Sequence, residues 1–287
     1  MSPSIGLRNL IRFSSPAASG GGASATPAWR ALLALAFVFS LATGACAQSS
    51  SEYKPEPGEA GKDVVWVPTD SPLVEKMLEI AKVTPDDYLI DLGSGDGRTV
   101  IAAAKRGLTA HGIEYNPKMV DLAKKHAAAA GVADRASFEK ADIFESDFSK
   151  ASVVTMFLLE DINIKLRPKI LGFKPGTRIV SNTFTMGDWQ ADETATIKNC
   201  VSWCTALLWI VPARVQGTWR LGEQDLVLKQ EFQMLSGQLG NSTIIDARMK
   251  GNEISFTTGG QKYVGTVDGN GMSGTIAGSG TNWSARK

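Results

Sequence analysis

Three glycines follow an apolar run near residue 90, and no other stretch of the chain indicates a chemical role more clearly. Residues 88–92 read Tyr-Leu-Ile-Asp-Leu, and Gly93, Gly95 and Gly97 stand at alternate positions after them. Glycine adopts positive φ angles at little cost and leaves the main chain uncovered, so a ligand can approach backbone N–H groups. A helix expected to begin near Thr99 would direct the free N–H groups of its first turn to the same place. The stretch predicts a nucleotide cradle.

The spacing of the glycines argues against a dinucleotide site. A dinucleotide-binding loop has the pattern G-x-G-x-x-G, whose third glycine would fall on Arg98, whereas here it stands one residue earlier, at Gly97. A second acid supports a different nucleotide ligand. The strand predicted at 109–114 ends on Glu114, about 20 residues after the glycines, where doubly wound folds place an acid that accepts hydrogen bonds from ribose hydroxyls.

A third motif, Ala141-Asp142-Ile143-Phe144, follows a strand predicted at 136–139. With an acidic-x-G-x-G-x-G turn, an acid at the end of the second strand and this third motif, in that order, the chain resembles the class I S-adenosylmethionine-dependent methyltransferases. The resemblance implies that Asp91 lies beside the methionine half of this cofactor, that Glu114 binds its ribose, and that Asp142 and Ile143 bracket its adenine. The cofactor-binding residues that it implies are Thr69, Asp91, Gly93, Ser94, Gly95, Asp96, Gly97, Glu114, Asp142 and Ile143.

The strand predicted at 152–159 would end near the transferred methyl group in such a fold. Neither Asn-Pro-Pro-aromatic nor Asp-Pro-Pro-aromatic follows it, which disfavours methylation of base amino groups. The chain instead resembles the bacterial relatives of the lysine methyltransferases that modify mitochondrial ATP synthase c-subunit and adenine nucleotide translocase. This resemblance extends over residues 63–212 and implies a protein lysine as acceptor. It rests on Val67-Pro68-Thr69, residues 91–98, Gly112-Ile113-Glu114, Leu158-Leu159, Leu166-Arg167-Pro168 and Met186-Gly187-Asp188-Trp189.

A lysine acceptor must lose a proton before it attacks the sulfonium. Its ordinary pKa near 10.4 makes deprotonation at about pH 7.4 cost roughly 4 kcal/mol, and a site lowers that cost by burying the amine or by offering acceptors that orient it. Glu160, Asp161 and Asn182 are the candidates for this catalytic role, and each could equally be an ordinary loop residue. Trp66 or Trp189 could wall the lysine stem, although aromatic side chains more often simply pack.

The elements around these motifs predict an α/β fold. Apolar residues at helical spacing, with Pro72 and Pro117 in first turns, indicate helices at 71–81, 99–105 and 117–130. Strands are predicted at 88–92, 109–114, 136–139, 152–159, 178–182, 194–202 and 205–211. The prediction is a Rossmann-like class I methyltransferase sheet, mostly parallel and closed by an antiparallel strand.

The N-terminal residues 1–47 are predicted to be a targeting segment. The apolar run at 31–42 is too short to span a bilayer; Arg30 precedes it and Gly44-Ala45-Cys46-Ala47 follows it. This pattern favours a signal peptide cleaved after Ala47, or lipidation at Cys46 after a poor lipobox, and hence an exported, periplasmic or membrane-anchored protein. Arginines without acids also resemble a mitochondrial presequence, and a misassigned start would leave a cytoplasmic protein. Because S-adenosylmethionine is made in the cytosol, export would require a supply outside it.

Charge and cysteine content exclude some classes of partner. The net charge is +1, and without the three arginines of 1–47 the chain has 27 basic and 29 acidic residues, so no nucleic-acid partner is expected. Cys200 and Cys204 are interpreted as ordinary cysteines, able to pair only if their segment is not helical. His111 and His126 are interpreted as structural, and no metal is expected, because zinc would need more ligands.

The remaining segments complete the domain plan. Residues 48–62 are polar with Pro and Gly and predict a disordered linker, followed by the methyltransferase domain at 63–212. Residues 213–287 contain seven short β-rich runs separated by glycine-rich turns, which predict an antiparallel meander or barrel. Gly217-Thr218-Trp219 and Trp283 resemble lipocalin-like modules. This domain would either recognise the substrate or only stabilise the protein.

The function predicted from the sequence is methyl transfer from S-adenosylmethionine to a protein lysine. Two alternatives remain: a small-molecule or lipid-linked methyltransferase, and an exported binding protein that keeps a vestigial cofactor fold.

Overall fold

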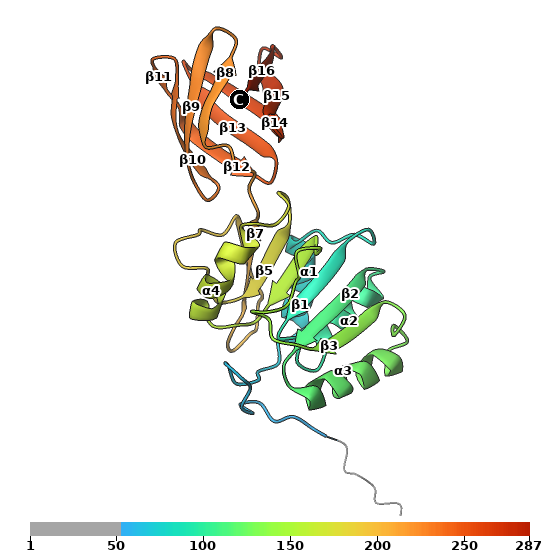
Figure 1. Ribbon diagram of the computed structural model, residues 1–287. Coiled ribbons are helices and arrows are strands. Elements are labelled where there is room, and N and C mark those ends of the chain that lie inside the picture. The colour runs from blue at the N-terminus through green and yellow to red at the C-terminus, as the bar shows by residue number, and fades with distance from the viewer. Residues whose placement is uncertain (1–52) are drawn as a thin grey trace, which may run out of the picture. The chain divides into compact units, whose positions relative to one another are not determined.

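A seven-stranded sheet forms the first part of the fold in the computed structural model, which describes residues 53–287 (Figure 1). The strand order is β3-β2-β1-β4-β5-β7-β6. The first five strands pair in parallel, whereas β7 pairs antiparallel with β5 and β6. The predicted fold class is confirmed. The strands are β1 (Tyr88–Leu92), β2 (Thr109–Glu114), β3 (Ala136–Lys140), β4 (Val153–Met156), β5 (Arg178–Asn182), β6 (Glu193–Thr196) and β7 (Thr205–Ile210).

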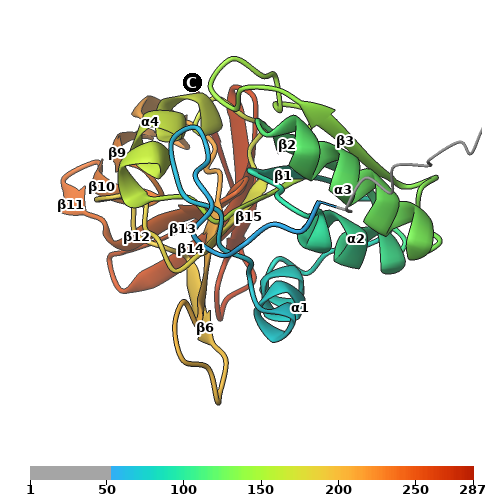
Figure 2. The ribbon, with the colours of Figure 1, turned by 90° about the horizontal axis from the view of Figure 1, so that it is seen from below.

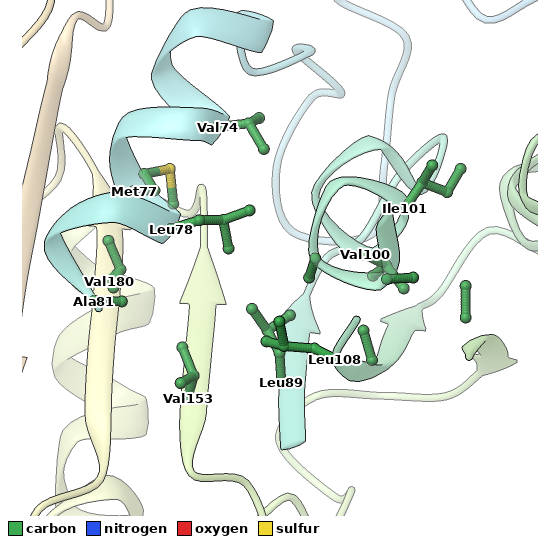
Figure 3. Packing of buried hydrophobic residues seen from close by; sticks show 14 of the residues in the cluster. Val74, Met77, Leu78, Ala81, Leu89, Val100, Ile101, Leu108, Val153 and Val180 are labelled. Carbon is green, nitrogen blue, oxygen red and sulfur yellow. The ribbon is translucent and has the colours of Figure 1, made fainter. Parts of the chain in front are cut away.

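Helices cover both faces of this sheet. The helices α1 (Ser71–Ile80), α2 (Arg98–Lys105) and α3 (Pro117–Ala129) share one apolar core with one face, and α4 (Glu160–Ile170) belongs to the core on the other. Figure 3 shows Leu78 of α1 and Val100 of α2 above Leu89 of β1. All three side chains are fully buried, and each such burial stabilises the fold by about 1.5–3 kcal/mol.

The helix α4 is an element that the sequence analysis did not predict. Pro168 lies inside it, near its C-terminal end, and obscured the helical pattern because proline normally interrupts a helix. Glu160 and Asp161 stand in its first turn, where negative charge stabilises the helix dipole. Among the described residues, no helix is long and apolar enough to cross a membrane. The targeting segment predicted at 1–47 lies outside the described residues.

The prediction of a disordered linker at 48–62 does not hold for residues 53–62. Gly58 N donates to Trp66 O at 2.8 Å, Trp66 N donates to Glu59 O at 2.8 Å, and Ala60 forms a bridge with Val65. The polar composition of this segment concealed its order, because backbone hydrogen bonds within residues 58–66 hold it and side-chain polarity does not reveal them. We call residues 59–69 the N-terminal strap.

The C-terminal part is a closed antiparallel barrel of eight strands, because β9 pairs with both β8 and β10. One of the seven β-rich runs expected from the sequence covers residues 225–235, and it is in fact two strands, which turn at Phe232, a residue with φ of +52°. Trp219, Phe256 and Trp283 fill the interior. The strands are β8 (Gly217–Leu221), β9 (Gln224–Glu231), β10 (Met234–Leu239), β12 (Ile245–Lys250), β13 (Glu253–Thr258), β14 (Gln261–Asp268), β15 (Gly271–Ile276) and β16 (Asn282–Arg286), with the two-residue β11 (Ser242–Thr243) added beside β10.

Cys200 and Cys204 form a disulfide in the loop between β6 and β7. Their interpretation as two ordinary cysteines is therefore wrong. The loop is not helical, and it brings the two Cα atoms to 5.7 Å, a separation that a disulfide spans readily.

Candidate functional site

A cleft lies where β1, β2 and β4 end, and the N-terminal strap forms another of its walls. It encloses about 1050 Å³, part of it open to solvent. The predicted cofactor residues converge here from distant parts of the sequence. All of them except Gly97 line the cleft: Thr69, Asp91, Gly93, Ser94, Gly95, Asp96, Glu114, Asp142 and Ile143.

Gly97 supports the glycine-rich turn without lining the cleft. It is the N-cap of α2 with φ of +83°, and a Cβ atom placed there would lie 2.8 Å from Ala123 and Phe138. Only glycine permits both the backbone conformation and the close approach of α3 and β3. Its role is therefore to position the turn.

The turn differs from the predicted cradle in one respect. The N–H groups of Gly93 and Ser94 donate to Ile113 O at 2.9 and 3.1 Å, and Gly95 N donates to Glu114 Oε2 at 2.9 Å. These amides are engaged within the protein, because the turn pairs with the end of β2. The turn can offer shape and a close approach to a ligand, and the acids around it supply the free hydrogen-bonding capacity.

Glu114 is held in place by two backbone donors. Its Oε2 accepts from Gly95 and its Oε1 accepts from Asn116 N at 2.8 Å. A carboxylate has about four acceptor sites, so each oxygen keeps capacity for a further donor. The pair of oxygens can therefore bind vicinal hydroxyls without giving up either backbone contact.

Asp91 is a buried acid at the end of β1. Thr155 Oγ1 donates to its Oδ1 at 2.6 Å. Burial raises the pKa of Asp91 to about 7, with smaller contributions from the charges of Glu114 and Asp96, while the Thr155 hydrogen bond opposes the shift. A cationic ligand group in the cleft would favour the ionised carboxylate.

The N-terminal strap contacts Asp142, the third acid of the cleft. Lys62 Nζ forms an ion pair with Asp142 Oδ2, and Phe144 N donates to Asp142 Oδ1 at 2.9 Å. The same ammonium lies 5.4 Å from the ring centroid of Tyr115 and 5.7 Å from that of Phe144. Lys62 was missed in the sequence because only three-dimensional packing brings it to a carboxylate 80 residues away.

Two further contacts hold the strap on the glycine turn. Arg98 Nη1 donates to Thr69 O at 2.8 Å, and Arg98 pairs with Asp96 at 2.7 Å. The Trp66 ring lies so close to Gly95 that a Cβ atom there would be 2.5 Å from Trp66 Nε1. The absence of a side chain at Gly95 thus makes room for the strap.

The three predicted catalytic residues lie outside the cleft lining. Asn182 is buried behind Thr69, and its Nδ2 donates to Thr69 Oγ1 at 3.3 Å. Glu160 and Asp161 are exposed at the start of α4, and Glu160 Oε1 accepts from Thr185 Oγ1 at 2.7 Å. Their catalytic role stays a prediction.

Among the aromatic candidates, Trp66 lines the cleft and Trp189 does not. Trp189 is buried and lies 6.3 Å from Trp209 between ring centroids, so the prediction that it walls a lysine stem is wrong. Phe157 lines the cleft at the end of β4, together with Met156, Leu158 and Ile162. The signal that could have indicated Phe157 was an aromatic residue near the C-terminal end of the strand predicted at 152–159.

The two histidines have structural partners. His111 Nδ1 lies 2.8 Å from Ser137 Oγ, and its Nε2 lies 3.2 Å from Glu139 Oε1. His126 Nδ1 lies 3.0 Å from Asp96 O. Neither ring lines the cleft.

Comparisons with known proteins address the same region. Residues 91–193 match the family described as ANTKMT methyltransferase domain. A protein-lysine N-methyltransferase of Saccharolobus islandicus (strain REY15A) is 45% identical over 139 residues, which cover 47% of this chain and 86% of that protein. The Mus musculus lysine N-methyltransferase named for the ATP synthase c-subunit is 35% identical over 45% of this chain and 52% of its own length. The adenine nucleotide translocase lysine N-methyltransferase of Mus musculus is 35% identical over 44% of this chain and 56% of its own length.

Among solved structures, an RNA methyltransferase from Salinibacter ruber in complex with S-adenosyl-L-homocysteine is 46% identical, with a TM-score of 0.49. The match covers 52% of this chain and 96% of that chain. This chain thus spans most of the length of the Saccharolobus islandicus relative but only about half the length of the two Mus musculus relatives.

Proposed function

The chain belongs to the protein-lysine N-methyltransferase family, and we propose on this basis that it transfers a methyl group from S-adenosylmethionine to the side-chain amine of a protein lysine. One observation carries the proposal: Asp91, Glu114 and Asp142 line one cleft at the end of a sheet with the strand order described above. Those acids match three polar parts of the cofactor, namely its amino group, its ribose and its adenine.

Each acid has a role set by its surroundings. Asp91, buried and hydrogen-bonded by Thr155, would accept from the cationic amino group. Glu114 would accept from the ribose hydroxyls with the capacity that its backbone contacts leave free. Asp142 and Ile143 would bracket the adenine, with Asp142 also tied to the N-terminal strap through Lys62. The bound cofactor supplies the electrophilic methyl group.

The acceptor end of the cleft is apolar. Met156, Phe157, Leu158 and Ile162 line it, whereas Glu160, Asp161 and Asn182 do not. An amine moved into apolar surroundings has a lower pKa, because burial penalises its charged form. We infer that desolvation helps to deprotonate the lysine. Alignment of the amine with the methyl group can supply about 7–11 kcal/mol of the barrier reduction.

Calorimetry of the full chain with S-adenosylmethionine tests the proposal. Asp91→Ala and Glu114→Ala are each expected to weaken binding at least about 10-fold, because a charged hydrogen-bond partner is worth about 1.5–3 kcal/mol. Asp225→Ala is the matched control, since this carboxylate is exposed in the barrel and, within residues 53–287, forms an ion pair only with Arg220. Unchanged affinity in both cleft variants would contradict the cofactor assignment.

A second measurement separates the alternatives. Methyl label from S-adenosylmethionine should appear in protein, and acid hydrolysis should release it as methylated lysine. Label in the organic extract instead would favour a small-molecule or lipid-linked acceptor. No detectable binding of the cofactor would favour the exported binding protein with a vestigial fold.

We also propose that the protein is exported or anchored at a membrane through residues 1–47. The disulfide between Cys200 and Cys204 supports this location, because disulfides persist mainly in oxidising compartments. Mass spectrometry of the native N-terminus after cell fractionation tests it. An intact N-terminus in the cytosolic fraction would refute it.

A further inference from the structure

Three aromatic side chains form a cluster between the cleft and solvent, in which Phe157 contacts the other two. Phe157 lines the cleft, and its ring stacks with Phe184 at a centroid distance of 6.0 Å. The Trp203 ring meets Phe157 edge-on at 5.8 Å. These residues come from the loops after β4, β5 and β6, which end near one another because β5 lies between β4 and β7. The cluster meets the acceptor end of the cleft at Phe157, which lines it together with other apolar side chains.

The loop that carries Trp203 is constrained. The Cys200–Cys204 disulfide closes it, and Asn199 and Trp203 have φ angles of +56° and +53°. A non-glycine residue with a positive φ angle costs about 1–3 kcal/mol of stability, and such strain concentrates at functional sites. The hairpin of β6 and β7 extends beyond the neighbouring strands of its sheet (Figure 2).

The apolar side chains of this loop are also exposed. Trp203 is 43% exposed, and Val201 is fully exposed. Core packing does not explain an exposed tryptophan held in a strained, cross-linked loop. Exposed apolar side chains next to a cleft are typical of a binding surface.

We propose that Phe157, Phe184 and Trp203, with Val201, form the surface that binds the acceptor polypeptide. This inference rests on the proposed function and specifies its substrate class: a lysine flanked by apolar residues. Phe157 and Phe184 contact the aliphatic stem of that lysine, as aromatic faces do for long basic side chains. Trp203 and Val201 contact the flanking residues.

Negative charge beside these aromatic residues favours a cationic side chain. Glu160 and Asp161 are exposed at the start of α4, directly after Leu158 and Leu159. The hydrogen bond from Thr185 to Glu160 ties this start to the residue after Phe184. These carboxylates attract the lysine while it is still protonated, before it enters the apolar end of the cleft.

Two dye-labelled peptides of eleven residues test the proposal, each with one central lysine. One has alanine and leucine on both sides of the lysine, and the other has serine and glycine. Fluorescence anisotropy measures their binding to the full chain in saturating S-adenosylhomocysteine. We expect the apolar peptide to bind more tightly, and Trp203→Ala to weaken its binding about 2- to 12-fold, the range that an aromatic contact of about 0.5–1.5 kcal/mol gives.

Further variants separate binding from folding. Trp203→Phe should retain most of the affinity, and the double variant Cys200→Ser with Cys204→Ser should lose affinity as Trp203→Ala does, because the loop is released. Ile245→Ala is the matched control, since this side chain is 57% exposed on the barrel. Calorimetry should give the same Kd for S-adenosylhomocysteine in all of them.

The outcomes are distinguishable. Equal or absent binding of the two peptides by the unaltered chain, or unchanged peptide affinity in Trp203→Ala, overturns the acceptor surface and leaves the proposed methyl transfer standing. Failure of the full chain to bind S-adenosylhomocysteine while the apolar peptide still binds through Trp203 overturns the methyltransferase proposal and leaves a peptide-binding surface.

Discussion

Asp91 shows how burial changes the chemistry of one side chain. In water an aspartate is ionised at neutral pH, but burial raises the pKa of Asp91 to about 7. Because this folded-state value lies above the unfolded one, Asp91 contributes stability that is present below about pH 4 and is lost as the pH rises towards 7. The protein thus keeps at the site an acid that destabilises its unliganded state near neutral pH.

The titration of Asp91 gives a pH-dependent prediction. Below about pH 7, binding that needs the ionised carboxylate must remove a proton from Asp91. The Kd of S-adenosylhomocysteine should therefore be about 10- to 30-fold higher at about pH 5.5 than at about pH 7.5. Calorimetry at both values measures it. Asp91→Asn should bind weakly with little pH dependence. The same pH dependence in that variant would assign the titration to another group.

The three acids of the cleft are oriented by different hydrogen-bond and ion-pair partners. Glu114 is oriented by two backbone N–H groups, Asp142 by Lys62 and Phe144 N, and Asp91 by Thr155. Residue type and spacing predicted these three acids correctly as members of one cleft. The donors that orient them come from the turn, the N-terminal strap and β4, and spacing alone did not reveal them.

At the scale of elements, the packing of the glycine turn and α2 against α3 and β3 depends on Gly97. Gly97→Ala should destabilise the protein by about 2–4 kcal/mol, because it adds a clash of a methyl group with Ala123 and Phe138 to the cost of a positive φ. Urea unfolding followed by circular dichroism measures the change in the free energy of unfolding.

Gly131→Ala is the matched control for this prediction. Gly131 has φ of +70°, but a Cβ atom there would meet nothing within 4 Å. The control should therefore cost only about 1 kcal/mol, from the backbone conformation alone. Equal losses in the two variants would mean that α3 and β3 shift away from the added methyl group without cost.

The N-terminal strap shows why composition misled at this scale. Its polar residues predict disorder when they are considered alone, since they bury little apolar surface. In the folded protein they find specific partners: Lys62 pairs with Asp142, Trp66 lies on Gly95, and Arg98 holds Thr69. These contacts make the strap a wall of the cleft.

At the scale of the whole molecule, the described residues 53–287 belong to one compact unit, although the fold contains a sheet and a separate barrel. The turn between β9 and β10 joins them. The Phe232 ring stacks on Trp189 at 5.8 Å, Gln233 Nε2 donates to Gln190 O at 2.7 Å, and Arg167 lies 5.1 Å from the Phe232 centroid. The barrel is therefore packed against the loop that precedes β6.

Phe232 provides the prediction at this scale. Phe232→Ala should destabilise the protein by about 2–3 kcal/mol, because a partly buried ring and its stacking on Trp189 are lost. Differential scanning calorimetry should then resolve separate transitions for the sheet and the barrel. Met234→Ala, on the same hairpin and 52% exposed, should keep the unaltered melting profile. A single unshifted transition in Phe232→Ala would show that other contacts join the two parts.

The sequence by itself determined the α/β sheet, its antiparallel closure and the β-rich C-terminal part. It also indicated ten cofactor-binding candidates, of which nine line one cleft, and their contact with the cofactor stays a prediction. These features follow from local rules, since glycine-rich turns, strand-end acids and alternating apolar residues act within a few positions of the chain. Tertiary structure alone decided that the N-terminal strap is ordered and that the helix α4 includes Pro168. It also decided that Cys200 and Cys204 form a disulfide and that Phe157 meets Trp203 in an aromatic cluster. The strap and the aromatic cluster depend on contacts between segments far apart in the sequence. The helix α4 contains a proline that locally disfavours a helix, and the disulfide depends on a loop conformation that the spacing of two cysteines does not reveal, so local patterns could not predict these features.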